Sequence, residues 1–522
     1  MTFRLQSCAE AIGDMIIDAQ AIEPGRTLQA DVCIIGAGPA GLTLATELDR
    51  HPIRVVILER GGKAGGQKPI ESVGNQGIPY RLGESRRYGI GGTAWAWDAN
   101  LGSVRNGAQL LPYDYHDFQC RHWIPHSGWP FGIEHLTDFY ERAYRICGLS
   151  PDELRAYDRL NAGPDSDIGL DADQITPSVS SYVCGDVFTR DLAHKVRKSP
   201  SIDIIFNAMA VDLESIGGGR HVTRVNVLSV DGHRRFSVEA KSFVLAAGGI
   251  ENPRILLDST SDVPKGLGND RDLVGRFFME HPRGEAGILI PRSKIMDRLR
   301  AYAVHTVDGY PIRVHLNVNG DLLSREHLQA CRFALWPTSP DWLDDDLRDL
   351  AVRCHNLHES GGRPMYALSF MLEQAPDRSN RIMLAKQSGN RTAVPTLDWR
   401  LGPSDYRSLI RCGQLLQEAF ERAGAGSLYL RPHSDETGGY ESLKWRGDSF
   451  PIRGSHHHIG TTRMHESADQ GVVDSSCQVH GTDNLFVAGS SVFPTSSHAN
   501  PTLTIVALSL RLADELKDQL PG

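Results

Sequence analysis

Short apolar runs separated by glycine-rich turns characterise the beginning of the chain. Residues 31–35, DVCII, form a β-rich apolar run of the kind that is buried in a parallel sheet. The glycine-rich segment 36–41 follows, and LTLATELDR after it has helical spacing. A second apolar run, RVVILE, ends at Glu59. This order of strand, glycine turn, helix and strand predicts a Rossmann-like α/β domain.

The middle of the chain has a different pattern. IRVHLNVNG (312–320) alternates apolar and polar residues, which predicts a strand with one buried face, and MYALSFMLE and NRIMLA are also expected to be strands. ALWPTSPDWLDDDLRDLA is expected to be a loop that leads into an exposed acidic helix. The segment 242–257, SFVLAAGGIENPRILL, is expected to be a buried strand followed by a glycine turn and a helix that opens near Pro253.

Composition narrows the class of protein. A chain of 522 residues that is 40% hydrophobic can bury large cores and is expected to form two domains. A net charge of −9 without a long basic run argues against a nucleic-acid surface. Nine scattered cysteines without a C-x-x-C pair fit reduced thiols in the cytoplasm. No export signal is recognisable, and the apolar runs are too short for a membrane span, so we expect a cytoplasmic enzyme.

The glycine segment fits the binding of a dinucleotide. Gly36 allows a tight turn, Gly38 lets the backbone approach a pyrophosphate, and Gly41 lets the helix pack on the strand. The helix N-terminus offers N–H groups to the phosphates, and Glu59 stands where a ribose hydroxyl is held. A glycine turn alone can be purely structural, but the complete unit favours a dinucleotide site.

A second glycine cluster lies in RRYGIGGTAWAW (86–97). Gly92 and Thr93 would let the backbone lie against a flat ring, and Trp95 and Trp97 would form walls of the cavity. An ordinary glycine loop with two core tryptophans is the plainer alternative.

The C-terminal part of the chain contains the candidate catalytic residues. HHHIGTTRM contains His457, and SSHANPTLT contains Asn500. Oxidation of an alcohol removes both a proton and a hydride, so it needs a neutral base and a hydrogen-bonding partner at the hydroxyl. A histidine and an asparagine suit these two roles, since an amide binds the oxygen without competing for the proton.

These motifs together resemble the glucose–methanol–choline (GMC) oxidoreductase family. GAGPAG with Glu59, GGTAWAW, SGWPFGIEHLTDFYERA, VLAAGGIENPRILL, LVGRFFMEHP and the C-terminal segment occur in the order of that family, over nearly the whole chain. The resemblance implies bound FAD and a discontinuous architecture. Residues 1–275 would begin the FAD-binding domain, 276–451 would form a substrate domain on an antiparallel sheet, and 452–522 would complete the FAD-binding domain.

The resemblance also implies the catalytic pair. The family's base lies four residues before the Thr of the G-T motif, which is His457 when counted from Thr461. The helix that follows places the second catalytic position on Asn500, with His498 at the edge of the substrate pocket or in a structural role. A metal site in the three consecutive histidines is disfavoured because adjacent side chains diverge and no carboxylate or cysteine lies at ligand spacing. A packed loop histidine remains the plainer alternative for His457.

Further cofactor contacts follow from the same resemblance. Gly489 and Ser490 would approach the ribityl chain and pyrophosphate, and Val211 would contact adenine through its backbone. Pro501 would open a helix whose positive end faces the flavin pyrimidine. Relatives that attach FAD covalently use a His where this chain has Ala96, so non-covalent FAD is expected.

The function implied is oxidation of a CH–OH group, with the proton passing to His457, the hydride to flavin N5, and reoxidation by oxygen or another acceptor. DWRLGPSDY and HANPTLT resemble bacterial members that oxidise sugars or aminoglycoside precursors. Acidic residues in WLDDDL and HSDETGGYES could favour a cationic substrate, although such runs are commonly solvated surfaces. A lyase of the same fold, like those that cleave hydroxynitriles, and an oxidoreductase on a non-sugar alcohol are the alternatives.

Overall fold

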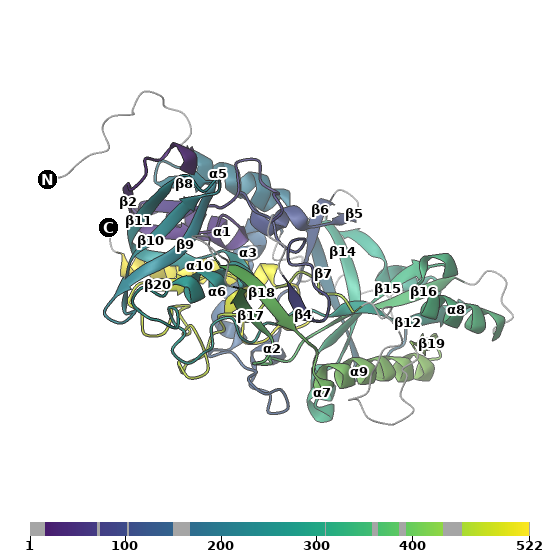
Figure 1. Cartoon of the computed structure of the whole chain (residues 1–522). Helices are drawn as coiled ribbons and strands as arrows, with labels where there is room; N and C mark the ends of the chain where they lie inside the picture. Colours follow the sequence, from purple (N-terminus) through teal and green to yellow (C-terminus); the bar gives the residue numbers. More distant parts are fainter. Residues whose placement is uncertain are drawn as a thin grey trace.

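Two large sheets, at opposite ends of the molecule in Figure 1, organise the fold. The computed structural model describes residues 16–69, 74–101, 104–149, 168–307, 310–357, 364–385, 393–431 and 452–520. Elements from the two ends of the chain lie together around the first sheet, and elements from the middle form most of the second (Figure 1). No helix among the described residues is both long and apolar enough to cross a membrane.

The first sheet confirms the prediction of a Rossmann-like domain. Apolar runs that are buried on both faces pair in parallel here, as expected for strands covered by helices. The parallel strands are, in order, β1 (Ile16–Asp18), β8 (Ile202–Phe206), β3 (Val55–Leu58), β2 (Thr27–Ile35) and β11 (Arg235–Leu245), with β20 (Leu485–Val487) also parallel to β11. The sheet continues with antiparallel β10 (His221–Ser229) and β9 (Ala208–Ile216).

Glycine positions the first helix, α1 (Pro39–Leu48), directly after β2. A Cβ on Gly41 would lie 2.0 Å from the carbonyl oxygen of Gly36, so only glycine lets the helix approach the turn this closely. The C-terminal helix α10 (Thr502–Gln519) packs against α1 and α3 (Thr137–Ile146). The last part of the chain is thereby held beside the first.

Helix α6 (Gly248–Asp258) begins five residues before Pro253, so the expected opening near Pro253 was too late. A proline inside a helix leaves the carbonyl four residues earlier without its usual donor. That carbonyl belongs to Gly249, and it accepts a hydrogen bond of 2.6 Å from the hydroxyl of Thr461. The proline therefore creates an attachment point for the C-terminal HHHIGTT segment.

The second sheet is antiparallel, as predicted. Its order is β19 (Gly426–Leu430), β12 (Arg283–Pro291), β16 (Met365–Leu372), β15 (Cys331–Thr338), β14 (Tyr310–Val318), β7 (Ile175–Cys184), β6 (Val104–Leu110) and β5 (Ala99–Leu101), and β13 (Val304–Val307) pairs with β14. One face packs against α9 (Pro403–Arg422) in an apolar core. β5, β6 and β7 come from within residues 1–275, so the proposed boundary at 275 does not separate the two sheets.

Two details of the middle region differ from the sequence expectations. The NRIMLA segment forms β17 (Arg381–Ala385), which belongs to a small third sheet with β18 (Val394–Trp399) and β4 (Asn75–Gly77). ALWPT lies in strand β15 rather than in a loop, and the acidic helix follows as α8 (Asp345–Leu357). Among the described residues, the other α-helices are α2 (Tyr115–Phe118), α5 (Ala193–Lys198) and α7 (Gly320–Glu326).

Candidate active site

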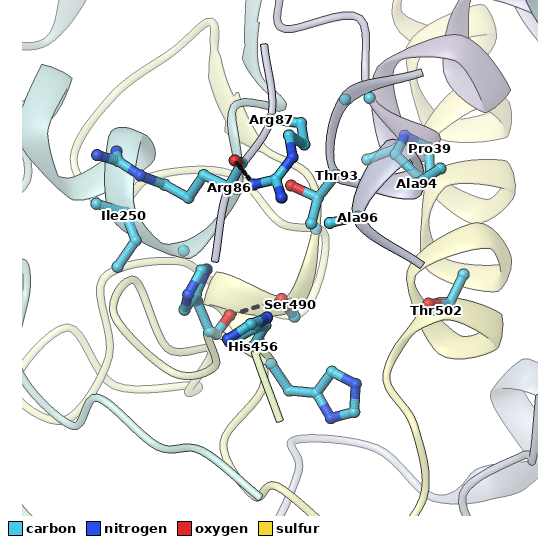
Figure 2. Close-up of a pocket in the computed structure, with 18 of the residues that line it drawn as sticks. Pro39, Arg86, Arg87, Thr93, Ala94, Ala96, Ile250, His456, Ser490 and Thr502 are labelled. Atoms are coloured by element: carbon cyan, nitrogen blue, oxygen red, sulfur yellow. Dashed lines mark hydrogen bonds between the residues drawn. The ribbon is translucent and has the colours of Figure 1, made fainter. Parts of the chain in front are cut away.

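A cavity of about 840 Å³ lies between the two sheets. Its lining comes from the glycine turn before α1, the 3₁₀ helix η2 (Gly92–Ala96), strands of the second sheet and the C-terminal segment. Thr93 and Ala96, Ile250, Ser490 and Thr502 surround this space in Figure 2. The motifs singled out in the sequence therefore meet at one place.

The two glycine clusters touch each other at this cavity. Gly36, Gly38, Gly92 and Thr93 all line it. Gly92 has a φ of 51°, and a Cβ there would lie 2.9 Å from the Cα of Gly38. The N–H of Gly91 donates to the carbonyl of Ala37 at 2.8 Å. This close backbone contact leaves the cavity free for a ligand along both loops.

Glu59 joins the loops through its carboxylate. It accepts backbone N–H groups of Ala37 (2.9 Å), Gly61 (2.7 Å) and Gly89 (2.8 Å). Burial raises the pKa of Glu59 above its usual value, against the lowering effect of these donors. The side chain lines the cavity, and a carboxylate can accept about four hydrogen bonds, so one more from a ribose hydroxyl fits.

The residues present fit FAD. Gly248 (φ 82°) and Gly489 (φ 109°) line the cavity, and a Cβ at either would meet no protein atom within 4 Å and so would occupy open space. The lining includes Glu59 and Ala208 as well as His457. Glycine turns, a buried carboxylate and open backbone positions are groups that suit a dinucleotide.

Several predicted contacts line the cavity and several do not. Gly489, Ser490, Asn500, Pro501 and Trp97 line it. Val211 does not: its carbonyl accepts from Arg254, and Ala208, Met209 and Ala210 take the expected place. Val211 is thus the next residue of β9 after the three that line the cavity, and its predicted contact with adenine stays a prediction.

Trp95, His498 and Gly41 also lie outside the lining. Trp95 is 41% exposed, and its indole N–H donates to the carbonyl of Ile90 at 2.8 Å. His498 is buried, and burial lowers its pKa to about 3. Neither residue lines this cavity, and for His498 the alternative of a structural role fits its burial; their place in a substrate pocket stays a prediction.

His457 lies at the cavity in contact with a second histidine. Its Nδ1 is 2.7 Å from Nδ1 of His281, and Nε2 of His281 is 2.8 Å from the carbonyl oxygen of Ser496. A carbonyl only accepts, so Nε2 of His281 carries a proton. Burial lowers the pKa of His281 to about 4, so the ring is neutral and its Nδ1 is an acceptor. His457 therefore donates from Nδ1 and keeps Nε2 unprotonated.

The surroundings keep His457 neutral. Burial, followed by nearby positive groups, holds its pKa well below the usual value. The neighbouring histidines have other partners: Nε2 of His458 contacts the hydroxyl of Ser85 at 3.0 Å, and His456 has a φ of 63° and faces the cavity. The three rings thus point to different places, as expected for adjacent residues.

Asn500 is oriented by an arginine. Nη2 of Arg332 donates to Oδ1 of Asn500 at 3.1 Å and contacts the sulfur of Met371 at 3.0 Å. A guanidinium has no acceptor, so the amide oxygen of Asn500 must face Arg332 and the NH₂ group is left to donate elsewhere. His457, with an unprotonated ring nitrogen, and Asn500, with an NH₂ group turned from Arg332, thus both line the cavity.

Sequence reasoning missed His281 and Arg332. His281 lies within LVGRFFMEHP, which carried the family resemblance without a role for any residue in it. Arg332 is a polar residue on an apolar strand, and no local motif marks it. The alternation of β14 and β15 was the available signal, because it places polar side chains on a buried face.

Comparisons with known proteins place similar sequences beside this chain. A model described as GMC oxidoreductase matches residues 376–509, and one for an NAD(P)-binding Rossmann-like domain matches residues 34–100. The large subunit of fructose dehydrogenase from Gluconobacter japonicus is 25% identical, covering 95% of this chain and 99% of the relative. The 6'''-hydroxyparomomycin C oxidase of Streptomyces lividus is also 25% identical, covering 96% and 93%.

Solved structures share the fold. Pyridoxine 4-oxidase from Mesorbium loti aligns with a TM-score of 0.54 and 17% identity, covering 93% of this chain and 99% of that one. Formate oxidase aligns with a TM-score of 0.57 and 14% identity, covering 95% and 99%.

Proposed function

We propose that this FAD-dependent member of the GMC oxidoreductase family oxidises a CH–OH group of a sugar or amino-sugar-like alcohol. The observation that supports this most is that two suitable residues line one cavity. His457 has an unprotonated Nε2, and Asn500 has an NH₂ group turned away from Arg332. This pair matches the needs of a hydroxyl group that must lose a proton while its oxygen stays bound.

FAD would be held by the loops around Gly38 and Gly92, by Glu59 and by the backbone at Gly489 and Ser490. When bound, it supplies the hydride acceptor, flavin N5. Ala96 lines the cavity and has no nucleophilic atom, so the attachment is non-covalent. Acid precipitation of the purified protein should release all the FAD, and yellow colour in the washed pellet would contradict this.

Residues of the chain would accept the proton and stabilise the charge on the substrate oxygen. Nε2 of His457 accepts the hydroxyl proton, while His281 holds the ring in the required tautomer through its contact with Nδ1. The NH₂ group of Asn500 donates to the substrate oxygen and stabilises the negative charge that grows there. Arg332, behind Asn500, adds a positive charge that favours the same state.

The proposed substrate class follows from the named relatives, which include fructose dehydrogenase and oxidases of hydroxyparomomycin and paromamine. Secondary metabolism such as aminoglycoside biosynthesis is one setting that they suggest. Oxygen or another electron acceptor would complete the cycle.

Anaerobic mixing of the holoenzyme with sugars, amino sugars and simple alcohols tests the proposal. A substrate of an oxidoreductase should bleach the visible absorbance of FAD. Turnover of a compound without bleaching would instead support a lyase of the same fold. Bleaching only by non-sugar alcohols would overturn the substrate class but keep the reaction.

A further inference from the structure

One face of the second sheet contributes uncharged side chains to the cavity. Strands β16, β15, β14, β7 and β6 are consecutive neighbours in this sheet (Figure 1). Alternate residues of β14 and β15 enter the apolar core against α9, and the residues between them face the other way. The large side chains that these five strands place in the lining are Gln109, Tyr182, Trp336 and Met371. An amide, a phenol, an indole and a thioether carry no charge, so this face suits an uncharged part of a ligand.

Trp336 offers the cavity a flat apolar surface that is fixed from behind. The guanidinium carbon of Arg313 lies 3.4 Å from the centroid of the indole ring. Arg313 is 1% exposed and Trp336 is 43% exposed, so the arginine covers the buried face of the ring and the other face is open. The indole N–H donates to the hydroxyl of Ser369 at 2.9 Å, which holds the ring in one orientation. The ring is therefore a preformed platform.

Two polar groups of the same face can bind hydroxyls. Gln109 and Tyr182 are opposite each other on β6 and β7, and both line the cavity. The amide nitrogen of Gln109 lies 2.6 Å from the hydroxyl of Ser180 and 2.6 Å from Nε2 of His315. One end of this amide is thereby used, and the other end is left for a ligand. The hydroxyl of Tyr182, 3.3 Å from the same nitrogen, can both donate and accept.

Two buried cations lie behind this face. Arg313 lies under Trp336, and Arg332 contacts Asn500. Burial lowers the pKa of both, to about 10 for Arg332, so both are charged at neutral pH, and no described carboxylate forms an ion pair with either. A ligand cannot bind them directly, because neither lines the cavity and their unpartnered nitrogens are buried. Their charge nevertheless acts on whatever lies against the uncharged surface in front of them.

The carboxylates that line the cavity lie elsewhere and have other partners. They are Glu59, Glu84, Asp98 and Glu251. Glu59 accepts three backbone N–H groups, and Glu251 is bound by two arginines. Glu84 and Asp98 lie in the surroundings of His456, and two arginines lie there with them. None of these four belongs to the five strands, so an ammonium group against this face would find no opposite charge there.

We propose that this face recognises a neutral sugar ring, stacked on Trp336 and hydrogen-bonded by Gln109 and Tyr182, and that it selects against protonated amino sugars. The proposal rests on the oxidation proposed above and narrows its substrate class. The flat side of a sugar ring presents C–H groups that suit an aromatic face, and its hydroxyls suit an amide and a phenol. An ammonium group is normally attracted to an indole face. Here Arg313 already occupies the opposite face, so a second cation would meet a like charge away from water.

Matched ligands test this in the wild-type protein. Holoenzyme that has been reduced with dithionite cannot take a hydride, so its calorimetric titration measures binding without turnover. D-Glucosamine is compared with 2-deoxy-D-glucose, and 6-amino-6-deoxy-D-glucose with 6-deoxy-D-glucose, at a pH at which the amines are protonated. Each pair lacks the same hydroxyl and differs in the charge. We expect each amine to bind at least roughly tenfold more weakly than its deoxy counterpart. Equal or tighter binding of the amines, or no binding of any of these sugars, would overturn the proposal.

Variants of Trp336 locate the platform. Trp336→Ala should weaken the binding of the neutral sugars about tenfold because the stacking surface is lost, and Trp336→Phe should recover part of the affinity. Trp342→Ala is the matched control, since this tryptophan is 77% exposed and lies outside the lining. It should bind every ligand as the wild type does. Unchanged affinity in Trp336→Ala, or an equal loss in Trp342→Ala, would refute the platform.

A variant of Arg313 locates the selection against amines. Arg313→Met keeps an apolar side chain under the indole ring and removes the charge. The difference between amine and deoxy sugar should then shrink to about threefold or less, with little change for the neutral sugars. Arg325→Gln, at an exposed position on α7, is the matched loss of charge and should keep the wild-type ratio. An unchanged ratio in Arg313→Met would refute the selection. If that variant does not fold, the ligand pairs and the Trp336 variants decide.

The two proposals fail in different ways. Binding of neutral sugars with the expected ratios but without bleaching of oxidised FAD by any compound would refute the oxidation and leave the sugar site in place. Bleaching by sugars that bind equally well to Trp336→Ala, or by amino sugars that bind as tightly as neutral ones, would refute the sugar site alone.

Discussion

The two walls of the cavity are built by different means. Toward the first sheet, the surface is mostly backbone: glycine turns approach each other, and Glu59 is satisfied by three N–H groups. Toward the second sheet, the lining includes the side chains of Gln109, Tyr182, Trp336 and Met371. A surface of backbone suits a ligand that is always the same, and a surface of varied side chains suits a specific substrate.

The C-terminal segment lies between these walls and carries the proposed chemistry. His457 is fixed by His281, whereas Asn500 is fixed by Arg332 from the second sheet. We therefore predict that substitutions in the glycine loops or at Glu59 affect the retention of FAD. Substitutions on the second sheet should instead affect the rate at which substrate reduces FAD.

The largest effect is expected for His457→Ala. Loss of a general base typically slows a reaction by roughly 10²–10⁴-fold, here the anaerobic reduction of FAD in a stopped-flow instrument. FAD content should stay normal because the glycine loops are untouched. His456→Ala, in the adjacent position, is the control. Near wild-type reduction by His457→Ala would remove this residue from the mechanism.

Asn500→Ala should have the next largest effect. A donor to a developing oxyanion contributes on the order of 3 kcal/mol, or roughly a hundredfold in reduction rate. Asn500→Asp is the sharper variant, since it keeps an oxygen toward Arg332 but removes the NH₂ donor. If it reduced as fast as the wild type, or if His498→Ala were the damaging change, the assigned position would be wrong.

The backbone wall was predictable from sequence because its signals are local. GAGPAG, the strand that ends at Glu59 and GGTAWAW each fix their own turn, and the sheet that they predicted is present. The lining toward the second sheet was not predictable, because Gln109, Tyr182, Trp336 and Met371 come from four strands far apart in the chain. Only sheet register brings them together.

The differences between the expected and the observed lining have the same origin. Val211 lies in a strand that reaches the cavity but is not itself in the lining, and Trp95 lies in a turn that reaches the cavity while its indole N–H binds Ile90. A motif identifies an element, whereas orientation within it depends on one residue of register. The roles of His281 and Arg332 depend on contacts with residues more than 160 positions away.

A smaller effect is expected at His281, which acts on the reaction through His457. His281→Ala removes the acceptor for Nδ1 of His457, so both tautomers become populated; we expect reduction about tenfold slower with little change in substrate affinity. His281→Asn places an amide oxygen where Nδ1 was and should recover part of the rate. Equal losses in both variants, or a loss in affinity instead of rate, would indicate a merely structural role.

The smallest effect concerns stability near the same segment. Burial raises the pKa of Glu280 to about 7, although Tyr80 and backbone donors at Ser455 and His281 oppose this. Because the folded protein binds this proton more tightly than the unfolded chain, its stabilising contribution is full below pH 4.5 and is lost as the pH rises through about 7. Glu280→Gln can keep an oxygen toward the backbone donors and direct its NH₂ group to Tyr80. Thermal unfolding of the holoenzyme between pH 5 and 8 should therefore show a fall in Tm that is roughly a few degrees larger for the wild type than for Glu280→Gln. Parallel profiles would show that Glu280 has an ordinary pKa, and that its hydrogen bonds outweigh its burial.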